Sequence, residues 1–254
     1  HPGLAHYIIH AYDHPPLAAR ALGAARRYAG IAPSAPHALH MPSHTFTRVG
    51  AWPESVETNR LSEQSALRNG VATEALHAMD YQTYAHLQMG QDRAAREVLE
   101  RLPAVAAQFD SAATAGGAAP PMAGFYALAA VPARYALERG AWQEAAELAV
   151  PSGGPPFTIA IRHFARALGA VRGGNPAGAR QDIERLAVLR DQLVASDAYW
   201  SEQVDIQWRA AGAWAAFAEG RRAEALEALL AAADIEDASD KAAVTPGPLA
   251  PARE

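Results

Sequence analysis

Helical stretches that end in glycine recur along the chain and constrain its fold more than any other feature. In each case a short turn follows the glycine, and a second helical stretch then opens with polar or acidic residues. The five glycines are Gly50, Gly90, Gly140, Gly174 and Gly220. Glycine suits the left-handed backbone conformation just past a helix end, and acidic residues suit a first helical turn. The pattern predicts five pairs of helices, and residues 1–13 and 16–30 predict a sixth.

The composition also favours helices. Of all residues, 50% are hydrophobic but only 7% are aromatic. Most of the hydrophobic residues are Ala and Leu, which lose little conformational freedom on entering a helix, and no strand pattern is evident. We expect an all-α fold, a right-handed α-solenoid of about six antiparallel helix hairpins. It would form one domain over residues 1–254, with a histidine-rich half at 1–90 and less regular repeats at 91–254.

Charge and residue content exclude several function classes. The net charge is −5 and no run of five like charges occurs, so we expect no nucleic-acid partner. The chain has no cysteine, which excludes disulfides, thiolate metal ligands and a cysteine nucleophile. No apolar stretch reaches the ~18 residues that cross a bilayer, so we expect no membrane span and a soluble protein, cytoplasmic or exported. Because the first residue is histidine rather than methionine and no signal-like segment precedes it, we expect a piece of a longer polypeptide or a processed chain.

Histidines are concentrated near the start of the chain. Seven of the ten fall within the first 44 residues: His1, His6, His10, His14, His37, His40 and His44. His6 and His10 have i, i+4 spacing, which places them on one helix face. His37, His40 and His44 have i, i+3 and i+7 spacing, which again predicts one shared face.

A third polar face follows in the next helix pair, where His77, Asp80, Tyr81 and Tyr84 have i, i+3, i+4 and i+7 spacing. Imidazole and carboxylate groups on neighbouring helices suit a divalent transition metal, and the residue types do not separate Zn, Cu, Fe and Mn. The metal ligands that we expect are His6, His10, His40, His44 and His77, with His37 and Asp80 as further candidates.

Pro42 leaves two interpretations of the segment that carries His40 and His44. Inside one continuous helix over residues 37–49, Pro42 would free the carbonyl of Ala38 and kink the helix axis. If Pro42 instead marks the start of a helix, His37 and His40 would lie in the preceding loop. The shared-face argument would then apply to His44 alone.

Familiar catalytic motifs are absent. The segments HYIIH and HMPSH share the histidine spacing of zinc metalloproteases, but Tyr7 and Met41 replace the glutamate that activates water. Neither a Gly-x-Ser-x-Gly elbow nor a phosphate-binding GxxxxGK[ST] loop occurs. The sequence leaves open whether the protein is an enzyme. If a catalytic metal is present, Asp80 and Tyr81 are the nearest acid–base candidates by position.

The turns GAWPES and GAWQEA resemble the tetratricopeptide repeat, as does the small-residue spacing of GRRAEALEALLAAA. HPGLAHYIIHAYD and HALHMPSHTFTRVG also resemble segments of a bacterial subgroup of tetratricopeptide-repeat proteins, which carries HPG-x-x-H-x-x-x-H and HMPSH in adjacent repeats of a longer polypeptide. The resemblance implies that the first helix of each pair lines a concave groove, so the three histidine-bearing faces would meet there. The subgroup tends to carry histidine and proline where Ala242 and Ala243 stand, which puts any role of that histidine in doubt here.

These observations leave three functions to weigh. The first is a solenoid whose histidine-lined groove binds a divalent metal ion, a small ligand or both, with metal-dependent catalysis as an extension. The second is an adaptor that binds a protein or peptide in the groove, the commonest use of helix-pair solenoids. The third is self-assembly, because a solenoid without strongly polar caps can stack end to end or form homo-oligomers.

Overall fold

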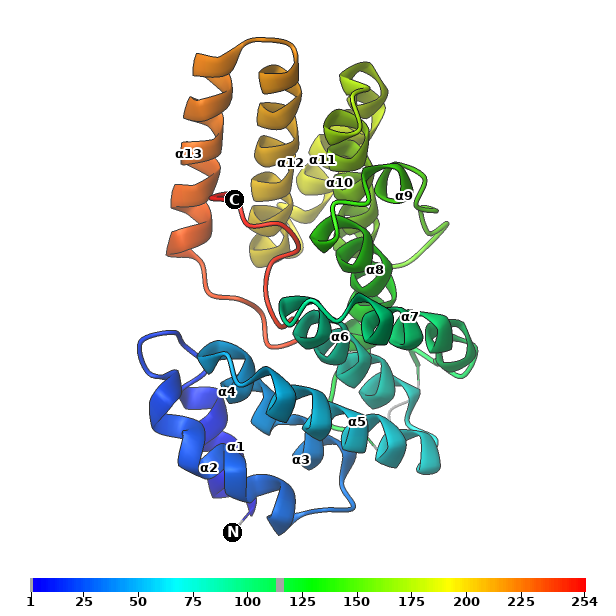
Figure 1. The fold of residues 1–254 in the computed structure, drawn as a ribbon, viewed down its shortest axis with the longest axis vertical. Helices are drawn as coiled ribbons and strands as arrows, with labels where there is room; N and C mark the ends of the chain where they lie inside the picture. Colours follow the sequence, from blue (N-terminus) through cyan, green and yellow to red (C-terminus); the bar gives the residue numbers. More distant parts are fainter. Residues whose placement is uncertain (1, 113–116) are drawn as a thin grey trace. The chain divides into compact units, whose positions relative to one another are not determined.

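The structure is a computed structural model that describes residues 2–112 and 117–254 (Figure 1). His1, one of the seven early histidines, lies outside the described residues. Within the described ranges every regular element is a helix, which confirms the all-α prediction. None of the described helices is both long enough and apolar enough to cross a bilayer.

The chain divides into two compact units. The first unit comprises His1–Val131 and Ala242–Gly247, and the second comprises Pro132–Lys241 and Pro248–Glu254. The first contains α1 (Pro2–Ala11), α2 (Ala18–Ile31), α3 (Pro36–His40), α4 (Pro42–Val49), α5 (Trp52–Arg68), α6 (Ala72–Gln88), α7 (Asp92–Ala106) and the start of α8 (Pro121–Glu138). The second contains the rest of α8, α9 (Trp142–Ala146), α10 (Pro156–Arg172), the 3-10 helix η1 (Pro176–Ala179), α11 (Arg180–Leu193), α12 (Ala198–Ala218) and α13 (Arg222–Ala238). A single repeat domain over the whole chain stays a prediction.

The predicted glycine turns are confirmed. The backbone angle φ is positive at all five positions: 73° at Gly50, 66° at Gly90, 62° at Gly140, 89° at Gly174 and 87° at Gly220. Each lies just past the end of a helix, where a left-handed residue reverses the chain. The sequence analysis missed a sixth such position, Gly70, with φ of 68°, which separates α5 from α6.

Two apolar clusters of the first unit hold its helices together. One joins α5, α6, α7 and the start of α8, and includes Leu76, Met79 and Val98. The other joins α1 and α2 to α3 and α4. In this second cluster the side chains of Ile9 and Met41 are fully buried. Because Ile9 lies between His6 and His10, and Met41 between His40 and His44, this packing fixes the helix faces that carry the histidines.

The segment around Pro42 differs from both interpretations of the sequence. A short helix, α3, ends at His40, and α4 begins at Pro42. Met41 between them keeps right-handed helical angles, and its amide donates to the carbonyl of His37. Since Pro42 has no N–H to offer the carbonyl of Ala38, the helix is interrupted there. The expectation of a continuous helix over 37–49 is therefore wrong, and so is the alternative that places His37 and His40 in a loop.

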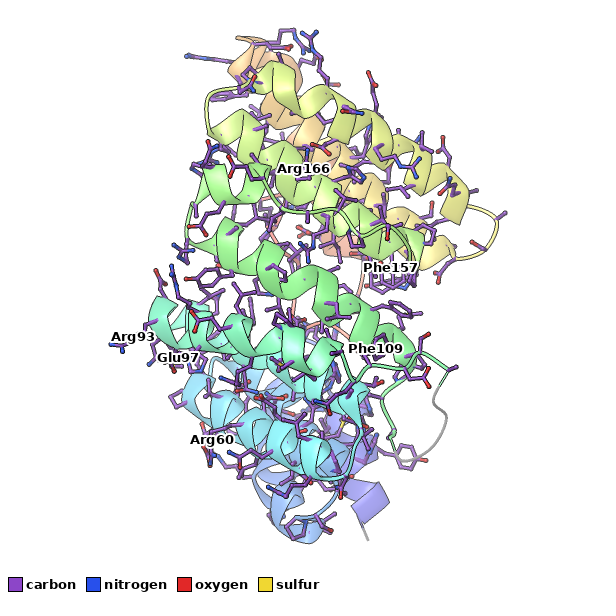
Figure 2. The ribbon with its side chains drawn as sticks, turned by 90° about the vertical axis from the view of Figure 1, so that its right-hand side faces the viewer. Arg60, Arg93, Glu97, Phe109, Phe157 and Arg166 are labelled. Atoms are coloured by element: carbon purple, nitrogen blue, oxygen red, sulfur yellow. The ribbon has the colours of Figure 1, made fainter. Side chains whose placement is uncertain are left out.

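Charged side chains cover the outer faces of the first unit. Arg60 on α5, and Arg93 and Glu97 on α7, project away from their helices (Figure 2). Arg93 and Glu97 form an exposed ion pair at 3.7 Å, a kind of contact that contributes little to stability. The opposite faces of α5 and α7 supply Ala66, Val98 and Leu102 to the buried cluster. Both helices are thus amphipathic, as packing on one side requires.

In the second unit, neighbouring helices pack in sequence from α9 to α13, and α10 contacts α9, α11 and α12. Phe157 lies at the start of α10 (Figure 2). Its ring stacks on Trp200 of α12, with ring centroids 4.1 Å apart and nearly parallel planes. Residues 248–254 return to this unit, where Ala252 packs against Ile206, Ala232 and Ala233.

Candidate metal site

Six histidines of the first unit converge in two groups. His40, His44 and His77, from α3, α4 and α6, form what we name the inner histidine group. His6, His10 and His37, from α1 and α3, form the outer histidine group. Within each group one nitrogen from each ring lies within 4.8 Å of the others, an arrangement that could hold a metal ion. Except for Asp80, every ligand that the sequence predicted belongs to one of the two groups.

The inner histidine group is closed off from solvent. Its three side chains are between 0% and 4% exposed. Nε2 of His40 lies 3.1 Å from Nε2 of His44. The ring of His77 lies against that of His40, with centroids 4.1 Å apart. Three imidazoles from three helices therefore meet in the buried interior of the first unit.

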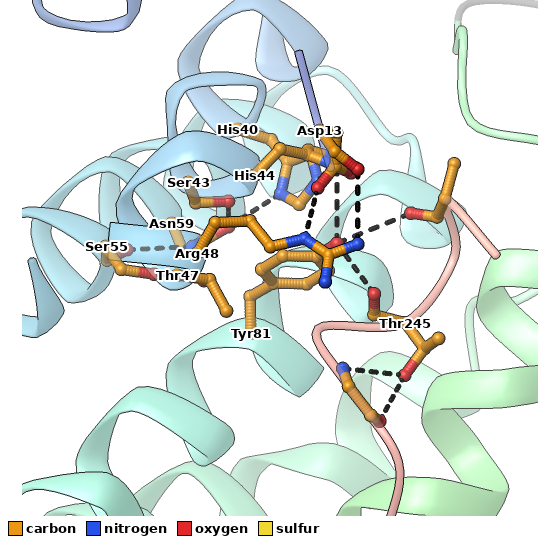
Figure 3. Close-up of polar contacts among 12 residues, drawn as sticks. Asp13, His40, Ser43, His44, Thr47, Arg48, Ser55, Asn59, Tyr81 and Thr245 are labelled. Atoms are coloured by element: carbon orange, nitrogen blue, oxygen red, sulfur yellow. Dashed lines mark hydrogen bonds and ion pairs between the residues drawn. The ribbon is translucent and has the colours of Figure 1, made fainter. Parts of the chain in front are cut away.

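An amide determines the hydrogen position on His40. Nδ1 of His40 lies 2.6 Å from Oδ1 of Asn59. The Nδ2 group of Asn59 donates to the carbonyl of Ser55 at 2.7 Å, which fixes the amide with its oxygen toward His40 (Figure 3). Because that oxygen can only accept, Nδ1 of neutral His40 carries the hydrogen and Nε2 carries the lone pair.

A carboxylate orients the ring of His44 in a similar way. Nδ1 of His44 lies 2.9 Å from Oδ2 of Asp13 (Figure 3). The other carboxylate oxygen of Asp13 accepts from Nε of Arg48 at 2.8 Å, and the Asp13 carbonyl accepts from the same guanidinium. In neutral His44 this arrangement places the hydrogen on Nδ1 and the lone pair on Nε2. Histidines that bind metals are commonly held in this way, with a carboxylate or carbonyl on the nitrogen away from the ion.

The two Nε2 lone pairs consequently face each other at 3.1 Å. Bare lone pairs repel at that separation, whereas a shared cation stabilises them. Two nitrogens bound to one tetrahedral metal at about 2.0–2.1 Å lie about 3.3 Å apart. The spacing of His40 and His44 is close to that value, so the pair is arranged for an ion without rearrangement of either helix.

The protonation state of His40 also suits metal binding. Burial lowers the pKa of His40 well below its usual value, and the neighbouring imidazoles lower it further. Neutral imidazole is the form that binds metals. His40 is therefore ready to act as a ligand at neutral pH.

Tyr81 lies among all three inner rings. Its ring centroid is 4.8 Å from that of His40, 5.2 Å from His44 and 5.3 Å from His77. Burial raises the pKa of Tyr81 well above its usual value, and the carboxylates of Asp13 and Asp80 raise it further. Its hydroxyl therefore keeps its proton. Asp80 is fully buried but belongs to neither histidine group, and the acid–base roles of Asp80 and Tyr81 stay predictions.

A short segment late in the sequence, Ala242–Gly247, belongs to the first unit and meets the site at Tyr81. The hydroxyl of Tyr81 donates to the carbonyl of Thr245 at 2.9 Å and lies 3.4 Å from that of Ala243 (Figure 3). Thr245 Oγ1 in turn donates to the carbonyl of Gly247. The segment Ala242–Gly247 is thus part of the surroundings of the inner histidine group.

The sequence analysis missed the residues that orient the histidines. Asp13, Asn59 and Glu74 contact His44, His40 and His37 respectively, and lie 31, 19 and 37 residues from them in the sequence. None shares a helix with the histidine that it contacts. No spacing rule links them, so the only signal in the sequence is the presence of polar residues at positions that helix packing buries.

Comparison of the chain with protein-family models, with curated proteins and with solved structures finds no significant match. The resemblance to the tetratricopeptide repeat therefore stays a prediction, and any function has to be argued from the site itself.

Proposed function

We propose that the protein binds a transition-metal ion in the inner histidine group, through His40, His44 and His77. The observation that carries this proposal is the pair of Nε2 atoms 3.1 Å apart, with each Nδ1 engaged by an oxygen. Burial of polar imidazoles is costly unless their nitrogens are satisfied. A metal ion satisfies the inward-facing nitrogens just as Asn59 and Asp13 satisfy the outward-facing ones.

The ligand chemistry narrows the choice of ion. Imidazole suits zinc, copper, iron and nickel, whereas magnesium, calcium and manganese prefer oxygen ligands. Three protein ligands are the number that catalytic zinc sites commonly use, with water or substrate in the fourth position. The same number here favours an ion that keeps one position open to a small ligand rather than a closed structural site.

Metal analysis tests the proposal directly. The purified chain is stripped with a chelator, reloaded with Zn²⁺, passed through a desalting column and analysed for bound zinc. We expect the His40→Ala/His44→Ala double variant to lose the ion of the inner histidine group. The His86→Ala variant serves as the matched control, because His86 lies on α6 like His77 but hydrogen-bonds to Gln91 and belongs to neither histidine group. Circular dichroism establishes that each variant is folded.

Two results would overturn the proposal. One is a folded wild-type chain that retains no zinc after desalting. The other is a folded double variant whose zinc content and affinity equal those of the wild type and of His86→Ala.

We also propose that the glycine-linked helix pairs are tetratricopeptide-like repeats stacked as a right-handed solenoid. The positive φ angles just past the helix ends support this relationship, as does the contact of each helix with the next in α4–α7 and α9–α13. An experimental structure provides the test. Helix pairs that fail to superpose on one another, or that stack with the opposite hand, would contradict it.

A further inference from the structure

We propose that the protein holds a second metal ion, in the outer histidine group of His6, His10 and His37, beside the ion of the inner group. This inference rests on the proposed function and extends it from one ion to two. It predicts a pair of neighbouring transition-metal ions held by six imidazoles.

The outer group repeats the hydrogen-bonding arrangement of the inner one. Nδ1 of His37 lies 3.3 Å from Oε2 of Glu74, as Nδ1 of His44 lies near the Asp13 carboxylate. Nδ1 of His6 lies 3.4 Å from the hydroxyl of Tyr28. Because the Glu74 carboxylate can only accept, Nδ1 of neutral His37 carries the hydrogen and Nε2 keeps its lone pair for a metal ion.

Glu74 is held in place to perform this role. Its side chain is 1% exposed, and Oε1 accepts hydrogen bonds from the amides of Ala118 and Ala119 at 2.7 and 2.8 Å. A buried carboxylate with one oxygen satisfied by the backbone has its second oxygen directed at His37.

The two histidine groups are adjacent but distinct. Ring centroids are 5.5 Å apart for His10 and His44, and 6.1 Å apart for His37 and His40. Within the outer group the rings are closer, at 4.7 Å for His6 and His10 and 5.2 Å for His6 and His37. The grouping follows from the ligand nitrogens, which lie within 4.8 Å of one another inside each set of three, and six imidazoles exceed the four ligands that a tetrahedral ion accepts.

Solvent access distinguishes the two centres. The inner group is buried, whereas His10 is exposed and His6 and His37 are partly exposed. We expect the outer ion to exchange faster and to be removed first by a chelator. An ion at the solvent side of a buried one is also the place where a small ligand from solution would first bind.

The experiment is a zinc titration of the full chain in the presence of a competing chelator dye, followed by metal analysis after desalting. We expect two zinc ions per wild-type chain and one ion per chain in the His6→Ala/His37→Ala variant. The milder His10→Ala variant, which changes an exposed side chain, should weaken only the second binding step. His14→Ala is the matched control, since His14 is exposed in the turn after α1 and belongs to neither group, and should keep two ions.

The outcomes separate this inference from the function on which it rests. One ion per wild-type chain, lost in His40→Ala/His44→Ala but kept in His6→Ala/His37→Ala, would overturn the second ion and leave the first. Two ions that persist in folded His6→Ala/His37→Ala would overturn the assigned ligands.

Cu²⁺ loading gives an independent readout, because neighbouring copper ions interact magnetically. We expect a weaker or broader electron paramagnetic resonance signal per copper in wild type than in the single-ion variant, and identical signals would contradict adjacent ions.

Discussion

The site depends, at the scale of single residues, on which ring nitrogen of each histidine carries the hydrogen. Four of the six histidines have an oxygen on Nδ1, supplied by Tyr28, Glu74, Asn59 or Asp13. None of these oxygens comes from the backbone, and the acceptor oxygens of Glu74, Asn59 and Asp13 set the tautomers of neutral His37, His40 and His44. Substitution of one of these partners should change metal affinity without removal of a ligand.

Asn59→Ala tests this role at His40. The substitution removes the oxygen on Nδ1 and allows His40 to rotate or to place its hydrogen on Nε2. We expect zinc affinity to fall about 10–100-fold, and the free energy of unfolding to fall by about 1–3 kcal/mol because a buried partner is lost. Competition titration and urea denaturation measure the two effects. Asn69→Ala, at the exposed end of the same helix, should change neither.

The buried His40 also predicts how stability depends on pH. Its pKa is lowered from 6.5 in the folded chain, while in the unfolded chain it stays near that value. Above pH 6.5 both states are neutral. Below it the unfolded chain binds a proton that the folded chain does not, so the free energy of unfolding falls as the pH decreases toward the folded pKa. Urea denaturation of the metal-free protein at pH 7, 6 and 5 measures this, and a weaker dependence is expected in His40→Gln.

At the scale of helices and turns, the sequence and the structure agree where the determinants are local. Gly50 was predictable because a helix end followed by a left-handed residue is a local feature of the chain. The clustering of His40 and His44 was predictable because i, i+4 spacing defines one face. Asp13 and Asn59 were not predictable, since each depends on how separate helices pack. The break at Met41 was ambiguous because proline is compatible with both a kink and a helix start.

Gly50→Ala examines the turn between α4 and α5. Gly50 has φ of 73°, a conformation that costs an L-residue about 1–2 kcal/mol. We expect stability to fall by that amount, although a Cβ there would meet only an ordinary contact with Trp52. Gly30→Ala is the matched control, because Gly30 lies within α2 and a Cβ would meet nothing within 4 Å. It should stabilise the chain by about 0.5–1 kcal/mol. A stabilised Gly50→Ala variant together with a destabilised Gly30→Ala variant would contradict the argument.

Tyr81→Phe separates a structural role of this residue from a ligand role. Loss of the hydroxyl removes the buried hydrogen bond to the carbonyl of Thr245. We expect faster hydrogen exchange in residues 242–247 and a loss of about 1–3 kcal/mol in stability, with zinc content unchanged. Loss of zinc from the folded variant would instead identify Tyr81 as a ligand.

At the scale of the whole molecule, the candidate metal ligands are confined to one of the two units. All six histidines and the residues that orient them belong to the first unit, together with the segment Ala242–Gly247. A fragment that ended at residue 131 would lack the carbonyls on which Tyr81 depends. Experiments on the site therefore require the full chain.

Hydrogen exchange with and without zinc tests the location of binding in the intact protein. A ligand present at 1,000 times its dissociation constant stabilises the folded state by about 4 kcal/mol, and this gain protects most strongly the helices whose opening would release the ion. We expect the amides of α1, α3, α4 and α6 to gain protection, since these helices carry the ligands. Helices α11, α12 and α13 carry none and should gain less. Mass spectrometry of peptic fragments provides the measurement, with His40→Ala/His44→Ala as the zinc-insensitive control for the inner group. Protection confined to α11–α13 would place the ion outside both histidine groups.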